Sequence, residues 1–208
     1  MAVDIDVVVE NSVKVIRETE TRCGLSIADL VGETVNGVYS APPNTCVLDG
    51  TGIKRIAELA FYDFHSYGQR IVGADFDNVE YVERNGLRYA FNNAVLQWLK
   101  IGKKLRVVGE YGMYGVAQST EVGGEYHFDV LELVEDYGFV YAFAGTKITK
   151  VFFPALVDIY PNAFYYAWRN CNELTEIHFR ADMESVVRQL AGFSNNFGAT
   201  NAQIIFDL

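Results

Sequence analysis

The chain has few of the residues that reactive or cross-linked proteins use. Its three cysteines stand far apart with no C-x-x-C pair, so the sequence indicates neither a disulfide framework nor a zinc knuckle. It has three histidines, none beside a recognisable Cys or Ser nucleophile, and it lacks G-x-S-x-G, H-E-x-x-H and P-loop motifs. We therefore expect no catalytic residue, no cofactor-binding residue, no metal ligand and no enzyme activity.

Positive charge and long apolar runs are also scarce. Lys and Arg number 17 against 27 Asp and Glu, a net charge of −10, which argues against nucleic acid as a partner. No run of about 18 uncharged apolar residues could span a membrane. The start of the chain, residues 1–6, is acidic where an export signal would be basic. We expect no membrane span and no signal peptide in this chain, and a location at the cell surface, in a phage particle or in the cytoplasm stays open.

What the chain does contain is a repeated nine-residue phrase. It consists of an aliphatic residue, two variable positions, a second aliphatic residue, three variable positions, a small residue and a large apolar residue. Its copies begin at residues 53, 79, 105, 131 and 156, which are 26, 26, 26 and 25 residues apart. A fixed period in this range predicts a solenoid, because one unit can bury its apolar side only against its neighbours. The phrase-ending residues should then be buried at equivalent positions; they are Phe61, Leu87, Met113, Phe139 and Phe164.

A second apolar phrase precedes each copy and ends in the alternation of a half-buried strand, most clearly in residues 96–101, 148–153 and 174–179. Two rows of side chains, with one residue from each strand, should lie on the outer face of the sheet. The first row is Asp75, Lys100, His127, Phe152 and His178, and the second is Gly73, Trp98, Glu125, Lys150 and Glu176. Because strands lie about 4.8 Å apart, the anchors of His127 and His178 should be roughly 10 Å apart, too far to share zinc ligation. We expect both to be solvated surface histidines.

The solenoid divides the chain into three parts. Residues 1–43 form an N-terminal cap or assembly segment, with strands on either side of residues 10–12 and a short helix over 27–31. Residues 44–179 form the solenoid, and residues 180–208 a C-terminal cap. In this cap an apolar stripe predicts a helix over 182–190, through Met183, Val186, Val187 and Leu190, before a strand at 204–206. The expected fold is α+β or mostly β: a solenoid of about five 26-residue repeats with two caps.

One stretch carries a family resemblance. Residues 148–179, with Pro154, Leu156, Ile159, Ala163-Phe164, Cys171, Leu174 and Ile177, resemble the BspA-like leucine-rich repeat, which reads roughly L-P-x-L-x-x-I-x-x-x-A-F-x-x-C-x-x-L-x-x-I. The end of the chain looks like that of such proteins encoded by gut bacteria and their phages or prophages. The resemblance implies a leucine-rich-repeat-like, non-catalytic solenoid for adhesion or protein binding, with no cofactor.

Two surfaces are candidates for binding a protein or a glycan. The strand face offers Trp98, Lys100, Lys150 and Phe152 around a depression expected at Gly123-Gly124. The flank that follows each nine-residue phrase offers tyrosines, which are common at protein interfaces: Tyr137, Tyr141, Tyr165 and Tyr166. The alternative hypothesis is a structural subunit of a phage particle that forms a homo-oligomer through residues 1–43.

Overall fold

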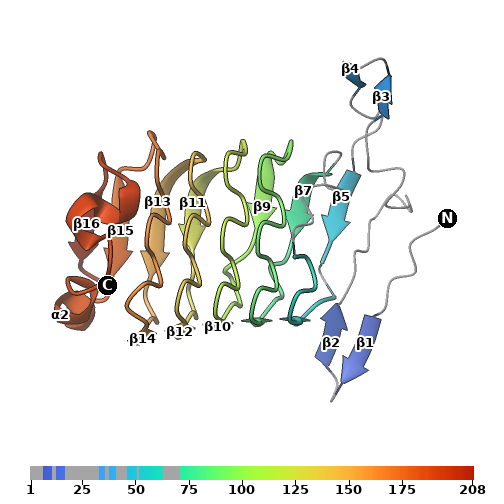
Figure 1. The fold of residues 1–208 in the computed structure, drawn as a ribbon. Coiled ribbons are helices and arrows are strands. Elements are labelled where there is room, and N and C mark those ends of the chain that lie inside the picture. Colours follow the sequence, from blue (N-terminus) through green and yellow to red (C-terminus); the bar gives the residue numbers. More distant parts are fainter. Residues whose placement is uncertain are drawn as a thin grey trace.

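The protein is a mostly β solenoid of about six turns with a spacing of about 26 residues, as the repeat predicted (Figure 1). The computed structural model describes residues 7–10, 13–16, 33–35, 38–40, 46–50, 52–62 and 71–208. The elements β1 to β4 lie at one end of the solenoid, and α2 and β16 lie at the other (Figure 1). No helix in these ranges is long and apolar enough to cross a membrane.

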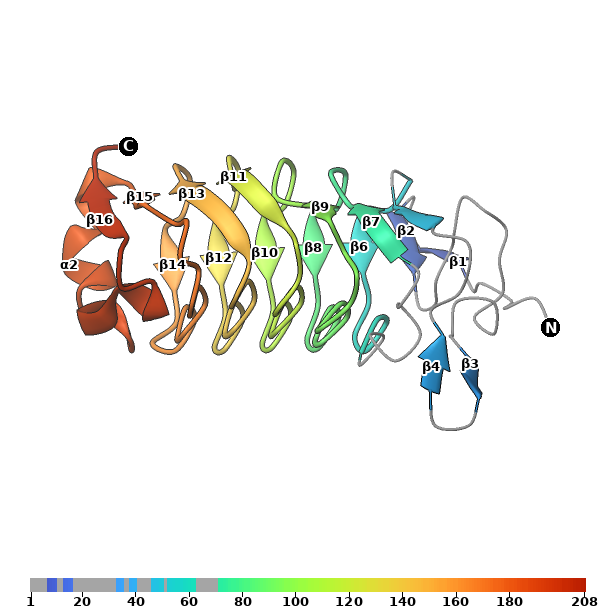
Figure 2. The same cartoon turned by 90° about the horizontal axis from the view of Figure 1, so that it is seen from above.

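Each turn contributes a two-residue strand to one parallel sheet. Val107 pairs with Tyr81 on one side and with Leu133 on the other, so the register of the sheet repeats the period of the sequence. Figure 2 shows the short strands following one another along the solenoid. The strands are β6 (Arg55–Ile56), β8 (Tyr81–Val82), β10 (Val107–Val108), β12 (Leu133–Val134) and β14 (Asp158–Ile159).

The N-terminal hairpin extends this sheet. Strands β1 (Val7–Glu10) and β2 (Val13–Ile16) lie on either side of residues 11–12, close to where strands were predicted; they pair antiparallel, and β2 pairs in parallel with β6. A second hairpin consists of β3 (Glu33–Val35) and β4 (Val38–Ser40). The helix predicted over 27–31 lies outside the described residues.

The longer strands form a second face that is divided into two sheets. Strands β5, β7 and β9 make the first sheet, and β11, β13, β15 and β16 make the second, all in parallel. Strands β9 and β11 are consecutive along the solenoid but belong to different sheets, so the face has a gap between them. The bounds are β5 (Cys46–Asp49), β7 (Ile71–Asp75), β9 (Trp98–Lys100), β11 (Gly123–His127), β13 (Lys147–Phe153), β15 (Glu176–Phe179) and β16 (Gln203–Phe206).

The core lies between the two strand faces and the turns that join them. The phrase-ending residues Phe61, Leu87, Met113, Phe139 and Phe164 have exposed fractions of 2% or less, which confirms that they are buried at equivalent positions. A second column stacks beside them, with the ring of Phe153 lying 5.1 Å from Phe128 and 5.2 Å from Phe179. Burial of such rings supplies the main stabilisation of each turn, because a fully buried large apolar side chain contributes about 1.5–3 kcal/mol.

The third side of each solenoid repeat is a series of tight backbone turns. In residues 85–93 the odd-numbered N–H groups donate to carbonyls of the next solenoid turn, as Leu87 does to Gly112 at 2.8 Å. Even-numbered N–H groups donate to the carbonyl three residues earlier, as Ala90 does to Leu87 at 3.0 Å. Left-handed backbone recurs every fourth residue, at Tyr111, Gly115 and Ser119 for example. The backbone is therefore satisfied without a strand or a helix on this side.

The C-terminal cap differs in part from the expectation. In place of one helix over 182–190, a 3-10 turn η3 (Ala181–Met183) leads into a short α2 (Glu184–Val187). Because a 3-10 turn has about 3.0 residues per turn, it rotates the following residues out of phase with an α-helical stripe. Met183, Val187 and Leu190 are buried, but Val186 is 39% exposed, so its assignment to the apolar stripe was wrong. A kinked 3-10 segment η4 (Phe193–Gly198) precedes β16, which pairs with β15 as the predicted final strand.

Candidate functional site: a gap in the strand face and a tyrosine band

The gap in the strand face is bridged by a side chain. In the apolar column that faces the core, β9 supplies Leu99 and β13 supplies Val151, but β11 supplies Tyr126. The Tyr126 hydroxyl donates a hydrogen bond to the Leu99 carbonyl across the gap. Its ring is buried 5.0 Å from the ring of Phe143, and this burial raises the pKa of the hydroxyl well above its usual range.

A hollow of about 480 Å³ opens over this bridge, with Leu99, Ile101 and Tyr126 among its lining residues. On the β9 side the Trp98 indole lies over Gly73, where an added Cβ would come within 2.0 Å of the ring. Lys100 also turns towards β7, with its Nζ 3.0 Å from the carboxylate of Asp75. Because both side chains lean away from β11, the space above the gap stays open.

The other two residues predicted for this surface lie outside the hollow. Lys150 and Phe152 belong to β13, on the far side of β11. The Lys150 ammonium is 2.8 Å from Glu176, which raises the pKa of the lysine. The ring of Phe152 is stacked between His127 and His178, at centroid distances of 4.4 and 4.6 Å. The structure thus brings Trp98 and Lys100 together, but it does not place Lys150 and Phe152 with them around one depression.

His178 is buried, with an exposed fraction of 8%, so the expectation of a solvated surface histidine was wrong for this residue. Its Nδ1 is 2.9 Å from Asp207 and its Nε2 is 3.0 Å from Glu176. Burial acts to lower the pKa of His178, but these two carboxylates outweigh burial and raise it. Its neighbour Glu176 has a lowered pKa, first because of Lys150 and then because of His178. Within the described ranges, no group of three or more His, Cys, Asp or Glu side chains could hold a metal ion.

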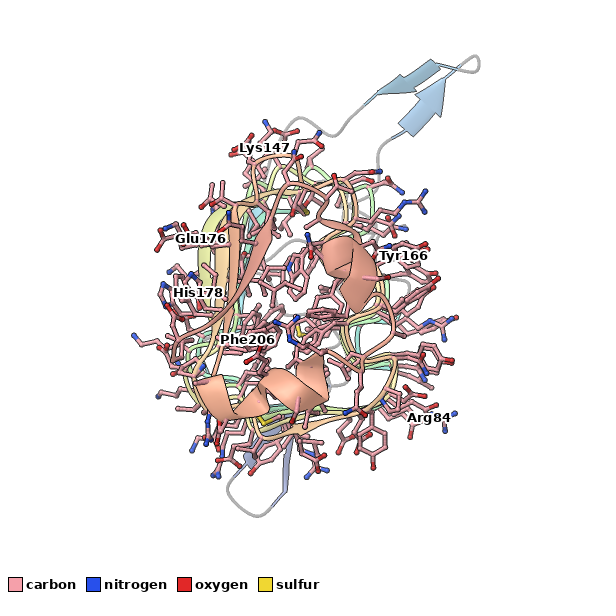
Figure 3. All side chains as sticks on the ribbon, turned by 90° about the vertical axis from the view of Figure 1, so that its left-hand side faces the viewer. Arg84, Lys147, Tyr166, Glu176, His178 and Phe206 are labelled. Carbon is pink, nitrogen blue, oxygen red and sulfur yellow. The ribbon has the colours of Figure 1, made fainter. Side chains whose placement is uncertain are left out.

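The second candidate surface is the tyrosine band on the turn side, which consists of Tyr89, Tyr111, Tyr114, Tyr137, Tyr141, Tyr165 and Tyr166. Figure 3 shows Tyr166 on the side of the solenoid opposite Glu176 and His178. Neighbouring rings are in contact: Tyr111 stacks on Tyr137 at 4.9 Å, and Tyr141 stacks on Tyr166 at 5.6 Å. Burial, followed by a hydrogen bond with Tyr89, raises the pKa of Tyr114.

Much of the tyrosine band stands on left-handed backbone. Tyr89, Tyr111, Tyr137, Tyr141 and Tyr166 have φ angles between 53° and 58°. This conformation is unusual for a bulky residue and costs roughly 1–2 kcal/mol per residue, less for Asn and almost nothing for Gly. Asn85 occupies the same place in the repeat as Tyr111 and Tyr137, so the scaffold accepts a residue that fits this backbone better.

A slot interrupts the tyrosine band. Arg88, Tyr114, Val140 and Tyr165 occupy equivalent places in successive turns, so a small valine stands where both neighbours along the column carry a phenol ring. A hollow of about 400 Å³ lies there, and its lining residues are Arg88, Tyr111, Tyr114, Tyr137, Val140, Tyr141 and Tyr165. A smaller hollow of about 110 Å³ adjoins it at Tyr141 and includes Arg169, Gln118 and Ser119.

The arginines of the tyrosine band differ from the others in the described part of the chain. Arg55, Arg84, Arg106, Arg180 and Arg188 each form an ion pair with a carboxylate. Among the described residues, Arg88 and Arg169 have no such partner. The Arg88 guanidinium carbon instead lies 5.1 to 5.6 Å from the ring centroids of Tyr62, Tyr89, Tyr111 and Tyr114, and Arg169 lies 5.5 Å from Tyr166.

Sequence reasoning named only part of this surface. Of the four tyrosines predicted from the sequence, Tyr137, Tyr141 and Tyr165 line the larger hollow, and Tyr166 stacks against Tyr141 beside it. It missed Arg88, Tyr111 and Tyr114 as site residues. Their signal was present in the repeat, because Arg88 and Tyr114 share one column with Tyr165, and Tyr111 shares another with Tyr137.

Comparisons with models of protein families, with curated proteins and with solved structures find no match to this chain.

Proposed function

We propose that the protein is a non-catalytic binding module that contacts a protein or glycan partner through the tyrosine band. The observation that carries this proposal is the position of five of the seven tyrosines on left-handed backbone, with side chains that remain half-exposed. Strained residues of this kind persist where the surrounding structure holds them, and they are concentrated at functional sites. Tyr111 and Tyr137 occupy the same place in the repeat as Asn85, which fits this backbone at a lower cost. The presence of tyrosine there in spite of that cost is consistent with selection for its side chain.

The physical properties of the tyrosine band suit binding. Tyrosine offers a large contact area and a hydroxyl with few rotatable bonds, and tyrosine is among the residues in which interface hot spots are enriched. The ladder of hydrogen bonds between turns holds the rings in place before a partner arrives, which reduces the ordering cost of association. The resemblance to BspA-like repeats supports the same role, since it implies adhesion or protein binding without a cofactor.

The test separates binding from stability. Ligands are selected for the purified chain from a glycan array and from a displayed random peptide library, and their affinities are measured for a Tyr111→Asn, Tyr137→Asn variant. We expect affinity to fall at least about tenfold, the weakening that accompanies loss of a hot spot. Stability should change little, because relief of the left-handed strain offsets the lost ring stack.

Tyr160→Ala supplies the matched control, because Tyr160 is 46% exposed and lies outside the tyrosine band. Ligands that bind the double variant and the wild-type chain equally well would contradict the proposal. So would the absence of any ligand from both sources.

The assembly role of residues 1–43 stays a prediction, because most of this segment lies outside the described residues. Light scattering on the full chain tests it: a binding module acting alone gives a monomer, and a particle subunit gives a defined oligomer.

A further inference from the structure

We infer that the slot over Val140 binds an acidic sugar residue, with the sugar ring between the tyrosines and its carboxylate on Arg88. This inference rests on the proposed function, because it names the ligand class of the tyrosine band.

The shape of the slot sets the size of the ligand. Val140 is almost completely buried, whereas its column neighbours Tyr114 and Tyr165 retain exposed surface. The missing phenol leaves room for one six-membered ring between them, and about 400 Å³ is within the range of about 300–1,000 Å³ for small-ligand pockets. The stacked pair of Tyr111 and Tyr137 and the ring of Tyr141 also line this space.

Charge sets the chemistry of the ligand. Arg88 lines the hollow, and its Nη1 donates a hydrogen bond to Asn85 at 3.1 Å. Its Nε is buried and has no hydrogen-bond partner in the described part of the chain. In a chain of net charge −10, whose other described arginines outside the tyrosine band each have a carboxylate partner, Arg88 has no carboxylate partner among the described residues, and its terminal nitrogens are the groups that an anion in the hollow would meet. A carboxylate is the group that a guanidinium binds through two parallel hydrogen bonds.

The surrounding tyrosines distinguish a sugar from other acidic ligands. Phenol rings offer apolar faces for the C–H side of a sugar, and their hydroxyls both donate and accept hydrogen bonds, as sugar hydroxyls do. A neutral sugar would cover the guanidinium and leave it without an anionic partner, at a desolvation cost. An acidic peptide side chain has no ring to fill the slot.

The adjoining hollow extends the site to an oligosaccharide. It shares Tyr141 with the slot and adds the polar side chains of Gln118, Ser119 and Asn170 with Arg169. A second sugar residue, linked to the one over Val140, would lie against these groups. We therefore expect oligomers to bind more tightly than the corresponding single acidic sugars.

The probes are trimers of galacturonic acid and of glucuronic acid, together with sialyllactose, measured by titration calorimetry on the full chain. Galactose trimer is the neutral reference, inorganic sulfate the simple anion, and an aspartate-rich peptide the acidic peptide. We expect at least one acidic saccharide to bind about tenfold or more tightly than the neutral trimer, since loss of a charged hydrogen-bond partner weakens binding by at least that factor.

Two variants locate the site. Arg88→Gln should reduce the affinity for the acidic saccharide about tenfold or more while keeping the slot, because the glutamine has no positive charge. Val140→Tyr should abolish binding by filling the slot, and tyrosine already occupies this column at Tyr114 and Tyr165. Arg106→Gln, at an arginine paired with Glu132 outside the tyrosine band, is the control and should have no effect. Circular dichroism checks that each variant is folded.

The outcomes separate this inference from the proposed function. If none of the three acidic saccharides binds more tightly than the neutral trimer, or if sulfate binds as tightly as they do, the inference is overturned. If only the peptide binds, and Tyr111→Asn weakens it, the inference fails while the binding role of the tyrosine band stands. Acidic saccharide binding that survives both Arg88→Gln and Val140→Tyr would also overturn the inference.

Discussion

At the scale of the residue, the Tyr126 side chain links the two halves of the strand face where their strands do not pair. Strands β9 and β11 do not pair, and the Tyr126 hydroxyl supplies the hydrogen bond that a strand neighbour would otherwise give to the Leu99 carbonyl. The neighbouring apolar positions of the column, Leu99 and Val151, carry no polar atom. A hydroxyl in this column is thus explained by the gap.

Tyr126→Phe should lower the free energy of unfolding by about 1–2 kcal/mol, because the ring still fills its place while the Leu99 carbonyl loses its partner. Urea denaturation measures the change. Tyr160→Phe, at a hydroxyl on an exposed ring, is the reference and should change stability by less than about 0.5 kcal/mol. Equal effects of the two substitutions would mean that the bridge contributes nothing to the fold.

The sequence predicted a depression at Gly123-Gly124, but not the gap between β9 and β11. Of the three apolar positions of a strand in this repeat, residues 123–128 keep only Tyr126 and Phe128. On its other side, β11 changes its register against β13 between Gly124 and Glu125. No side-chain pattern records such a shift. Lys150 and Phe152 were therefore assigned to a depression that they do not line.

At the scale of the element, the run of turns has its own sequence rule. Asn93, Ser119, Gly145 and Asn170 occupy the same place in successive turns, and each has a left-handed backbone. These residue types are the ones that tolerate this conformation, or, for serine, bear it at some cost. Tyrosines conceal the same rule in the neighbouring column, at Tyr89, Tyr141 and Tyr166, which is why the sequence predicted strands readily and this element not at all.

Gly145→Ala and Ser119→Gly should have opposite effects on stability. The alanine Cβ would meet no atom closer than 3.5 Å, so its cost is that of the left-handed backbone alone, about 1 kcal/mol. Ser119→Gly removes a Cβ from the equivalent backbone, φ 59°, and should stabilise the protein by a few tenths of a kcal/mol up to about 1 kcal/mol. Paired urea titrations measure both, and the same sign for both would contradict the assignment of this column.

The attachment of the last strand is expected to depend on pH. His178 on β15 contacts Asp207, which follows β16 directly, and the pKa of His178 is raised in the folded protein. A raised pKa contributes stability that is fully present below the unfolded value of about 6.5 and is lost as pH rises through the folded value.

The stability difference between the wild-type chain and His178→Gln should therefore be larger at about pH 5.5 than at about pH 8.5. Denaturation at a series of pH values measures it. Asp207→Asn should remove much of this dependence, because it removes one of the two carboxylates that raise the pKa. A difference that grows with increasing pH would show that the charged form of His178 is not the one that the fold favours.

At the scale of the whole molecule, each solenoid turn contacts mainly its neighbours. The period alone predicted the register of the short strands, since Tyr81, Val107 and Leu133 pair in series at that spacing. The tyrosine band could not be predicted in the same way. Its slot requires Arg88 and Tyr165, which are far apart in the sequence, to line one hollow, and this depends on how closely four successive turns stack.

Deletion of residues 105–130, one complete repeat, should leave a folded protein. The deletion joins Lys104 to Leu131, an aliphatic residue at the same place in the repeat as Leu105, so every remaining turn keeps its phase. It removes Tyr126 and the gap, and places β9 beside β13, where backbone pairing can close the strand face. Stability in a solenoid is approximately a sum of repeat and neighbour terms, so we expect cooperative unfolding at a lower urea concentration with a smaller denaturant slope.

Deletion of residues 105–117, half a repeat, is the control: it puts strand residues against turn residues, and we expect no cooperative transition. If the two deletions behave alike in circular dichroism and urea denaturation, phase along the 26-residue period does not determine this fold.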